Sequence, residues 1–255
     1  MSTIDERRER ASAGVAVRDE TEWRDGFARP RVFLQPIAAP SILGLAGFSV
    51  ATMMVATIQA GWWGSPADLP VVAPFCAMFG GLAQFAAGMW SYRARDAVAT
   101  LAHGTWGAFW LAFGILEGMI AAGVLPSVAP TAANLPLGLW FLGLAYVTLS
   151  AALASVVESI GIFAVLGTLA TGSALTAGGL MTGGLASGWT KAGGWAFVIS
   201  AGCAWYVLTA MVMAAASGRT VLPLFKRQKA ANVPLQQPVE PIQLAWSEPG
   251  VKQGQ

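Results

Sequence analysis

Charged side chains are scarce in this chain of 255 residues. Only 11% of the residues are Asp, Glu, Lys or Arg, whereas 55% are hydrophobic and the mean hydropathy is +0.59. Soluble domains carry roughly 25% charged residues. The shortage excludes an ordinary soluble domain and predicts an all-α integral membrane protein, because long apolar segments satisfy their backbone in lipid by forming helices.

Cysteine and histidine are also almost missing. The two cysteines, Cys76 and Cys203, lie inside apolar runs, and His103 is the single histidine. These counts exclude a disulfide framework and a four-ligand metal site. The apolar runs contain no nucleophile with a base and an orienting partner, and the chain has no glycine loop followed by lysine for phosphate. We therefore expect no enzyme activity, and no cofactor, metal or nucleic-acid partner.

Long apolar runs dominate what is present. Each is close to the ~20 residues that a membrane-spanning helix needs. The six runs are Ser41–Trp63, Val71–Trp90, Val98–Val124, Leu137–Val157, Gly161–Leu185 and Gly194–Ala216. They predict a charged N-terminal tail (residues 1–38), a six-helix transmembrane domain (residues 39–216) and a polar, partly disordered C-terminal tail (residues 217–255).

Positive charge is distributed unevenly around these runs. Seven arginines lie in the N-terminal tail, and Arg93 and Arg95 lie between the second and third runs. The connectors on the opposite side contain only Lys191, whereas the C-terminal tail opens with Arg219, Lys226, Arg227 and Lys229. Lysine and arginine favour the cytoplasmic side. Both termini are therefore predicted to be cytoplasmic, in a multi-pass protein of the cell (inner or plasma) membrane.

A few polar side chains and close glycine pairs interrupt the apolar runs. Polarity inside lipid is costly and usually has a function, but Gln84 could equally bond a neighbouring helix. His103 fits a helix contact better than a proton relay, and Glu117 fits snorkelling towards the outer surface better than a proton site. Glycines four residues apart, such as Gly114 and Gly118, predict closely packed helices. These glycine contacts could lie within one helix bundle or between two copies of the protein.

Lysine and arginine are absent from the six runs. An unpaired carboxylate in a low-dielectric interior costs several kcal/mol or more. If a carboxylic acid crosses the membrane through this protein, it would therefore cross in its neutral form. Alternatively, neutral donors such as the Ser41 hydroxyl and the N–H groups of a helix beginning at Pro40 would hold its anion briefly. A passive channel for small neutral solutes such as urea or short amides is an alternative. A membrane sensor whose tails bind partners is another.

Several motifs follow one another along the chain. The first helix carries Pro40-Ser41-Ile-Leu-Gly44-Leu45-Ala-Gly47-Phe48. The other motifs are Phe79-Gly-Gly-Leu-Ala-Gln84, Thr105-Trp-Gly-Ala-Phe-Trp110, Gly194-Trp195, Ala204-Trp-Tyr206 and Gly218-Arg-Thr-Val-Leu-Pro223. In this order they resemble the motifs of the succinate–acetate permease family of acetate uptake transporters. The first motif is similar to the family signature Asn-Pro-Ala-Pro-Leu-Gly-Leu, although Ala39 and Ile42 replace Asn and the second Pro.

The resemblance implies a homohexamer of six-helix protomers in the lipid bilayer, each taking up acetate, sometimes succinate, with a proton. By matched position, Phe48 and Trp106 would form a hydrophobic constriction, completed by a residue near Ala170. Trp106 stands where Tyr is usual. Ala204 would face the pathway and affect substrate size, and Gln84 would line it. Without the resemblance, Phe48 and Trp106 are better interpreted as packing aromatics.

Overall fold

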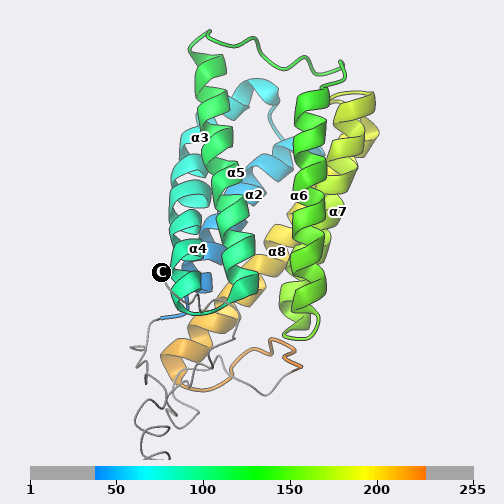
Figure 1. Cartoon of the computed structure of the whole chain (residues 1–255). Helices are drawn as coiled ribbons and strands as arrows, with labels where there is room; N and C mark the ends of the chain where they lie inside the picture. Colours follow the sequence, from blue (N-terminus) through cyan, green and yellow to red (C-terminus); the bar gives the residue numbers. More distant parts are fainter. Residues whose placement is uncertain (1–37, 228–255) are drawn as a thin grey trace, which may run out of the picture. The chain divides into compact units, whose positions relative to one another are not determined.

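The computed structural model describes residues 38–227 of the chain. Residues 1–37 of the predicted N-terminal tail and residues 228–255 of the predicted C-terminal tail lie outside this part. The described part is built from helices (Figure 1). They are α2 (Pro40–Ala60), the 3₁₀ turn η1 (Pro66–Asp68), α3 (Leu69–Phe75), the π-helix η2 (Cys76–Ala83), α4 (Gln84–Arg93), α5 (Ala97–Ala121), α6 (Leu135–Ser155), α7 (Ile160–Thr182) and α8 (Gly188–Ser217).

Six helical spans within residues 38–227 are long and apolar enough to cross a membrane. Five of them are α2, α5, α6, α7 and α8, and the sixth is Pro66–Arg93, which combines η1, α3, η2 and α4. This confirms the predicted all-α fold with six helical spans of membrane-crossing length. Within the described residues 38–227, the one β pairing is an isolated bridge that joins Ser159 to Lys226.

The second span is not a continuous α-helix. Pro74 lies inside α3 and lacks the N–H that would bond the carbonyl four residues earlier. Two residues later the chain enters the π-helix η2, and it returns to α-helix at Gln84. A π-helix has more residues per turn than an α-helix, so it changes the face on which later side chains lie, and such insertions are frequent at functional sites. The π-helix η2 therefore affects the direction in which the Gln84 side chain points.

Several predicted helix boundaries differ from the structure, and two of the differences have a clear local cause. α8 begins at Gly188, because Ser187 caps it by accepting a hydrogen bond from the Thr190 backbone N–H (3.1 Å). Most of the predicted connector Ala186–Gly193 is therefore helical, and hydropathy misses this turn because it is polar and rich in glycine. α2 ends at Ala60, before the predicted Trp63, because Gly61 takes a left-handed conformation with φ 82°.

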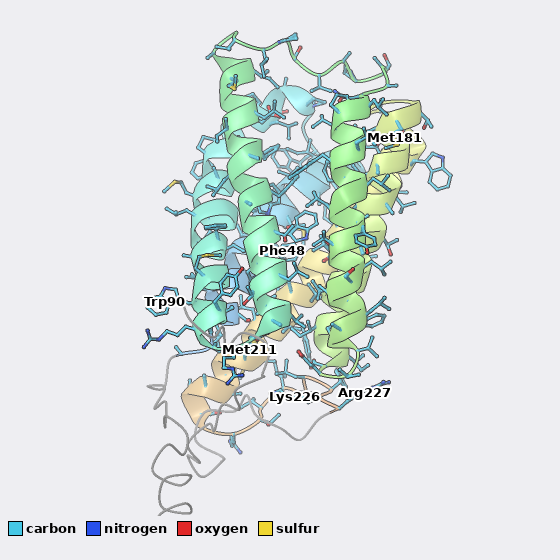
Figure 2. All side chains as sticks on the ribbon, in the orientation of Figure 1. Phe48, Trp90, Met181, Met211, Lys226 and Arg227 are labelled. Carbon is cyan, nitrogen blue, oxygen red and sulfur yellow. The ribbon has the colours of Figure 1, made fainter. Side chains whose placement is uncertain are left out.

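The central helix of the bundle is α2. It packs against α8, η2, α4 and α5, and 61% of its most apolar window is buried, a larger share than in the other five spans. Figure 2 shows the Phe48 side chain of α2 in the middle of the helices. On the other side of the bundle, α6 packs against α7, and α7 packs against α8. The first-helix signature therefore lies where most helices meet.

Glycines permit the close contacts around the second span. A Cβ atom added at Gly80 would lie 2.5 Å from the Ala51 Cβ, and one added at Gly107 would lie 2.5 Å from the Phe85 backbone nitrogen. Gly114 likewise packs against η2, so its contact lies within the bundle. A Cβ atom at Gly118 would meet open space. Gly114 and Gly118, the predicted glycine pair, therefore have different environments: Gly114 makes a contact inside the protomer, and Gly118 faces outwards.

The chain after α8 folds back along the connector between α6 and α7. The Ser159 hydroxyl donates to the Leu224 carbonyl (2.6 Å), and the Arg227 N–H donates to the Glu158 carbonyl (3.1 Å). The Tyr206 hydroxyl of α8 donates to a carbonyl of the same stretch (2.8 Å). We call residues 223–227 the return segment, and Figure 2 labels two of its side chains. It fixes the connector that carries Glu158.

Candidate functional site

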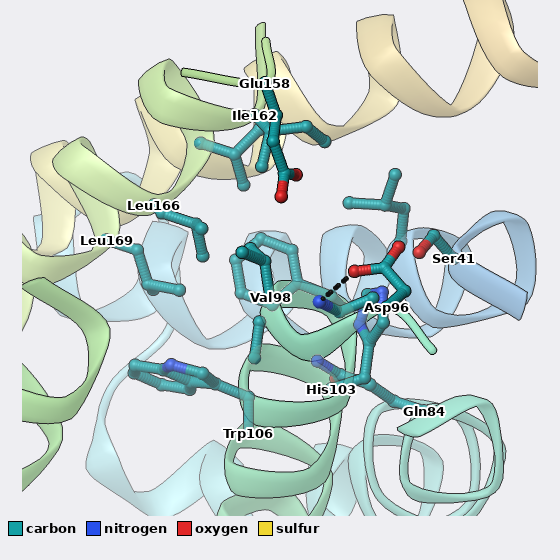
Figure 3. A pocket seen from close by; sticks show the side chains of 15 residues that line it. Ser41, Gln84, Asp96, Val98, His103, Trp106, Glu158, Ile162, Leu166 and Leu169 are labelled. Atoms are coloured by element: carbon teal, nitrogen blue, oxygen red, sulfur yellow. Dashed lines mark hydrogen bonds between the residues drawn. The ribbon is translucent and has the colours of Figure 1, made fainter. Parts of the chain in front are cut away.

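A cavity of about 70 Å³ lies between α2, α4, α5 and α7, at the end of the bundle where α2, α5 and α7 begin. One water molecule needs roughly 10–15 Å³ of such space, so several waters or one small solute would fit. We call this the inner cavity (Figure 3). Most of its lining is aliphatic, and its polar lining residues are Ser41, Gln84, Asp96, His103, Trp106 and Glu158.

A smaller cavity, of about 30 Å³, lies further along α2. We call it the outer cavity. Its polar lining from α2 is Thr52 and Gln59, and its walls are mostly aromatic: Trp106, Phe109, Trp110, Phe141 and Phe197. Trp106 is the one residue that lines both cavities. Its indole ring therefore forms a wall between the inner and the outer cavity.

Trp106 is held on several sides. The side chain is 3% exposed, and its Nε1–H donates to the Thr148 hydroxyl of α6 (3.0 Å). Its ring meets Phe48 edge to face at a centroid distance of 6.3 Å, and it meets Phe109 at 5.1 Å and Phe197 at 6.3 Å. Each aromatic contact of this kind stabilises the fold by about 0.5–1.5 kcal/mol, in addition to the contribution of the apolar area that it buries. The donor and the ring faces are thus already engaged.

The structure brings together only some of the predicted pathway residues. Phe48, Trp106 and Gln84 all line the inner cavity. Ala170 and Ala204 are buried at 6% and 0% exposure, but neither lines the inner or the outer cavity. The lining residues of α7 are Ile162, Val165, Leu166 and Leu169, and the last of these comes one position before Ala170. A one-residue step turns a helix by about 100°, so an alignment that is correct to one residue still selects the wrong face.

The first-helix signature contributes in two ways. Pro40 begins α2, and Ser41 and Leu45 line the inner cavity. Ala39 occupies the N-cap position and offers no side-chain cap, whereas an Asn there would accept a hydrogen bond from the first turn. The first N–H groups of α2 therefore have no side-chain acceptor from the capping residue.

The glycines of the signature make room for polar side chains. A Cβ atom at Gly44 would lie 2.5 Å from the His103 ring. A Cβ atom at Gly47 would collide with the Phe79 carbonyl oxygen and lie 3.5 Å from the Gln84 Cβ. The small face of α2 thus seats His103 of α5 and Gln84 of α4 side by side against the inner cavity.

Four buried side-chain atoms in the described part of the chain have no hydrogen-bond partner. They are Thr52 Oγ1, Gln84 Oε1, His103 Nδ1 and Trp110 Nε1. Gln84 and His103 line the inner cavity, and Thr52 and Trp110 line the outer cavity. An unpaired buried polar group costs about 1–3 kcal/mol, and such a group needs an explanation. All four lie on the two cavities, as expected for groups that bond water or a passing solute.

Two carboxylates lie at one end of the inner cavity. Figure 3 shows Asp96 and Glu158 there, with Trp106 and Gln84 at the other end. One Asp96 oxygen accepts a hydrogen bond from the Ala99 N–H (2.8 Å) and so caps α5. Burial raises the pKa of Glu158 above its ordinary value, and the negative charge of Asp96 raises it further. The two charged side chains that line this end of the cavity are therefore both acidic.

Sequence reasoning missed several lining residues. Asp96 and Glu158 lie in connectors, and Thr52, Gln59 and Trp110 were not predicted to line a pathway. The signal that could have found some of them is helical spacing. The lining residues of α2 are Ser41, Leu45, Phe48, Thr52, Val55, Ala56 and Gln59, and steps of three or four residues connect most of them. This is the spacing of one helix face.

Other singled-out residues lie away from the cavities. Glu117 is 7% exposed and lies four residues before the end of α5, and its snorkelling towards the outer surface stays a prediction. Arg219 is exposed and follows Gly218, the left-handed residue that ends α8. Neither lines the two cavities. Across residues 38–227, no group of three His, Cys, Asp or Glu side chains could hold a metal ion.

The sequence profile of the GPR1/FUN34/yaaH family matches residues 28–226. A relative from Yarrowia lipolytica, described as "Glyoxylate pathway regulator", is 28% identical over 162 residues, which is 58% of this chain and 58% of that protein. This chain therefore spans about 58% of the length of that curated relative. The profile match includes all residues that line the inner and outer cavities.

The fold is similar to a solved structure described as the bacterial acetate channel SatP. The identity is 25% and the TM-score is 0.66. The likeness covers 74% of this chain and 99% of that chain. Nearly the whole of that channel therefore has a counterpart here.

Proposed function

Because the chain belongs to the GPR1/FUN34/yaaH family, the acetate uptake transporter family, we propose that it is a membrane channel or transporter for short monocarboxylates such as acetate. The observation that carries this proposal is the pair of cavities that meet at Trp106 inside a bundle of membrane-length helices. The similarity to an acetate channel supports it. Family and fold both favour transport over catalysis.

The acid is proposed to cross in its neutral form, together with its proton. Lysine and arginine are missing among the residues that line the two cavities, and the charged lining residues are Asp96 and Glu158. A carboxylate anion would therefore meet like charges at the inner mouth and no compensating cation further in. Burying an unpaired anion costs several kcal/mol. Protonation removes that cost.

Phe48 and Trp106 are proposed to form the constriction of the pathway. Their edge-to-face contact closes the passage between the two cavities, whose volumes are about 70 and 30 Å³. A two-carbon acid fits such a passage more readily than succinate, which must shed a second hydrated group. We therefore propose that acetate is preferred and that succinate enters more slowly.

Uptake into proteoliposomes tests the proposal. Labelled acetate and labelled urea are compared at two external pH values. Acetate uptake should rise as the pH falls towards the pKa of the acid, and urea uptake should stay at the level of empty liposomes. Fast urea uptake with acetate uptake that ignores pH would indicate a passive channel for neutral solutes. If neither solute enters, the protein is not a transporter, and a sensor role is favoured.

Both termini are proposed to be cytoplasmic, with residues 1–38 and 217–255 as cytoplasmic tails. The supporting observation is the bias of lysine and arginine. In a Cys76→Ala, Cys203→Ala background, single cysteines replace two exposed connector residues, Ala94 and Ala133. A membrane-impermeant maleimide should label position 133 in intact cells and position 94 only after lysis. The opposite pattern would reverse the topology.

The protein is further proposed to assemble as a homohexamer in the cell (inner or plasma) membrane. The resemblance supports this, and Gly118 of α5 and Gly202 of α8 would meet open space with an added Cβ atom. Such outward-facing glycines let a second helix approach closely in lipid. Native mass spectrometry of the detergent-extracted protein should give six copies. A monomer that persists in mild detergent and in nanodiscs would contradict the proposal.

A further inference from the structure

His103 and Gln84 are buried polar residues that the protein itself does not satisfy. Their exposed fractions are 5% and 2%, and His103 Nδ1 and Gln84 Oε1 have no partner. Both line the inner cavity, where Figure 3 shows them together near its Trp106 end. A buried polar group that lacks a protein partner is normally paired with water or with a ligand. Two such groups on one wall therefore indicate a binding site.

Three helices hold these side chains in place. Gly44 of α2 leaves space only for the His103 ring, because an added Cβ atom there would lie 2.5 Å from it. Gly88 of α4 packs against the backbone at His103 and Gly104, where an added Cβ would lie 2.6 Å from the Gly104 nitrogen. Gln84 begins α4 directly after the π-helix. Tight packing keeps both groups on the cavity wall, so their hydrogen-bonding atoms are preorganised.

The hydrogen-bonding capacity of the pair is specific. A neutral imidazole has one N–H donor and one ring-nitrogen acceptor, and a primary amide has an acceptor oxygen and two N–H donors. A protonated carboxyl group carries one O–H donor beside one acceptor oxygen. It can therefore donate to one residue of the pair and accept from the other. A carboxylate has only acceptors, so it could accept from the N–H groups of the pair but would leave the Gln84 oxygen without a donor.

We propose that His103 and Gln84 form a site that binds the protonated carboxyl group of the transported acid. This inference deepens the proposed function and rests on it. The charged groups that face the site across the same cavity are Asp96, from the connector before α5, and Glu158, from the connector before α7. Both are acidic, so they add to the discrimination against the anion. Trp106 closes the far side of the site.

The single histidine of the chain allows a direct test of binding. The full-length protein is labelled with ¹⁵N-histidine, purified through a tag that contains no histidine, and placed in nanodiscs. Acetate is then titrated at pH 5 and at pH 7.5. The imidazole signals should shift saturably at pH 5. The apparent Kd, expressed as the concentration of total acetate, should be higher at pH 7.5 than at pH 5 by about two orders of magnitude. The reason is that an acid with a pKa near 4–5 is that much less protonated at pH 7.5.

Variants separate binding from packing. His103→Asn keeps a polar atom near Nδ1, whereas His103→Leu keeps only bulk. At pH 5, His103→Leu should raise the apparent KM for acetate uptake about tenfold, and His103→Asn should raise it less than about threefold, because a neutral hydrogen bond contributes modestly. Gln84→Leu should reduce the ¹⁵N shift with the histidine still present. Thr209→Val, on an exposed face of α8, should match the wild type and is the control.

The outcomes distinguish this inference from the proposed function. If acetate is transported but the histidine signals do not move and His103→Leu keeps the wild-type KM, the site is refuted and the transporter stands. If the signals respond to acetate but no uptake occurs, the proposed function fails and the site stands. If acetamide shifts the signals as strongly as acetate, with no dependence on pH, the ligand is an amide and the carboxyl assignment is overturned.

Discussion

The inner and outer cavities differ in chemistry although they share the Trp106 ring. The inner cavity combines an amide and an imidazole with two carboxylates at its mouth. The outer cavity is less than half as large, and its unpaired groups are the Thr52 hydroxyl and the Trp110 N–H, both of which can donate. The unpaired groups of the inner cavity include an amide oxygen, which can only accept. Trp106 thus separates two cavities that offer a solute different hydrogen-bonding groups.

Removing the shared wall should have the largest effect. Trp106→Ala joins the two cavities and removes a buried ring, which costs about 3–5 kcal/mol of folding stability. The ratio of succinate to acetate uptake, measured per folded protomer, should rise several-fold. Thr148→Val removes only the partner of the indole N–H and is the control for a change in local packing. An unchanged ratio in Trp106→Ala would mean that this ring is not the constriction.

Filling the space next to Gly44 that the His103 imidazole ring occupies should have the next largest effect. Gly44→Ala forces a methyl group against the His103 ring, and overpacking of this kind costs about 1–3 kcal/mol. The melting temperature in detergent should fall, and the inner cavity should lose its preference for neutral acid. Gly143→Ala, on an exposed face of α6, adds the same methyl group in open space and should leave both properties unchanged. Equal melting temperatures for the two variants would refute the close contact between α2 and His103.

A smaller change should affect the outer cavity alone. Thr52→Val replaces an unpaired hydroxyl by a methyl group of similar size, so stability should stay the same or rise by up to about 1 kcal/mol. The apparent KM for acetate should rise a few-fold, while the ¹⁵N response of His103 to acetate at pH 5 should not change. A loss of that response would show that the two cavities are not separate environments.

The smallest effect concerns the mouth of the inner cavity. Burial and Asp96 raise the pKa of Glu158 in the folded protein above the unfolded value of about 4.3. Between these two values the folded state binds more protons than the unfolded state, so stability should fall as pH rises through this window. Glu158→Gln should flatten that dependence in melting curves recorded from pH 4 upwards. A dependence that persists in the variant would assign it to another group.

The six spans were predictable because about 20 apolar residues suffice to define a membrane helix, and the structure confirms them. The π-helix was not predictable, because Pro74 marks a break without saying how the backbone repairs it. Asp96 and Glu158 lie 62 positions apart in short polar connectors. Only the folded bundle, in which the residues before α5 and before α7 border the same cavity, brings them to one mouth, and no local sequence pattern indicates this.

Site residues were predictable where a sequence motif identified their position on a helix. They were not predictable where the position depended on an alignment without a motif. Phe48 and Trp106 lie in clear motifs, and the structure places their rings in contact. The fifth span has no such motif, which is why Ala170 was proposed while Leu169 lines the cavity. That these aromatic residues gate a solute is still a prediction, because contact alone is also what packing produces.

The return segment has a practical consequence for anyone who alters the C-terminus of the gene. Its hydrogen bonds to the α6–α7 connector end at Arg227. A stop codon or a fluorescent fusion placed after codon 227 leaves these bonds in place. A stop codon before codon 223 removes them and releases the backbone that presents Glu158 to the inner mouth. A shortened gene product could therefore reach the membrane and still respond differently to acid.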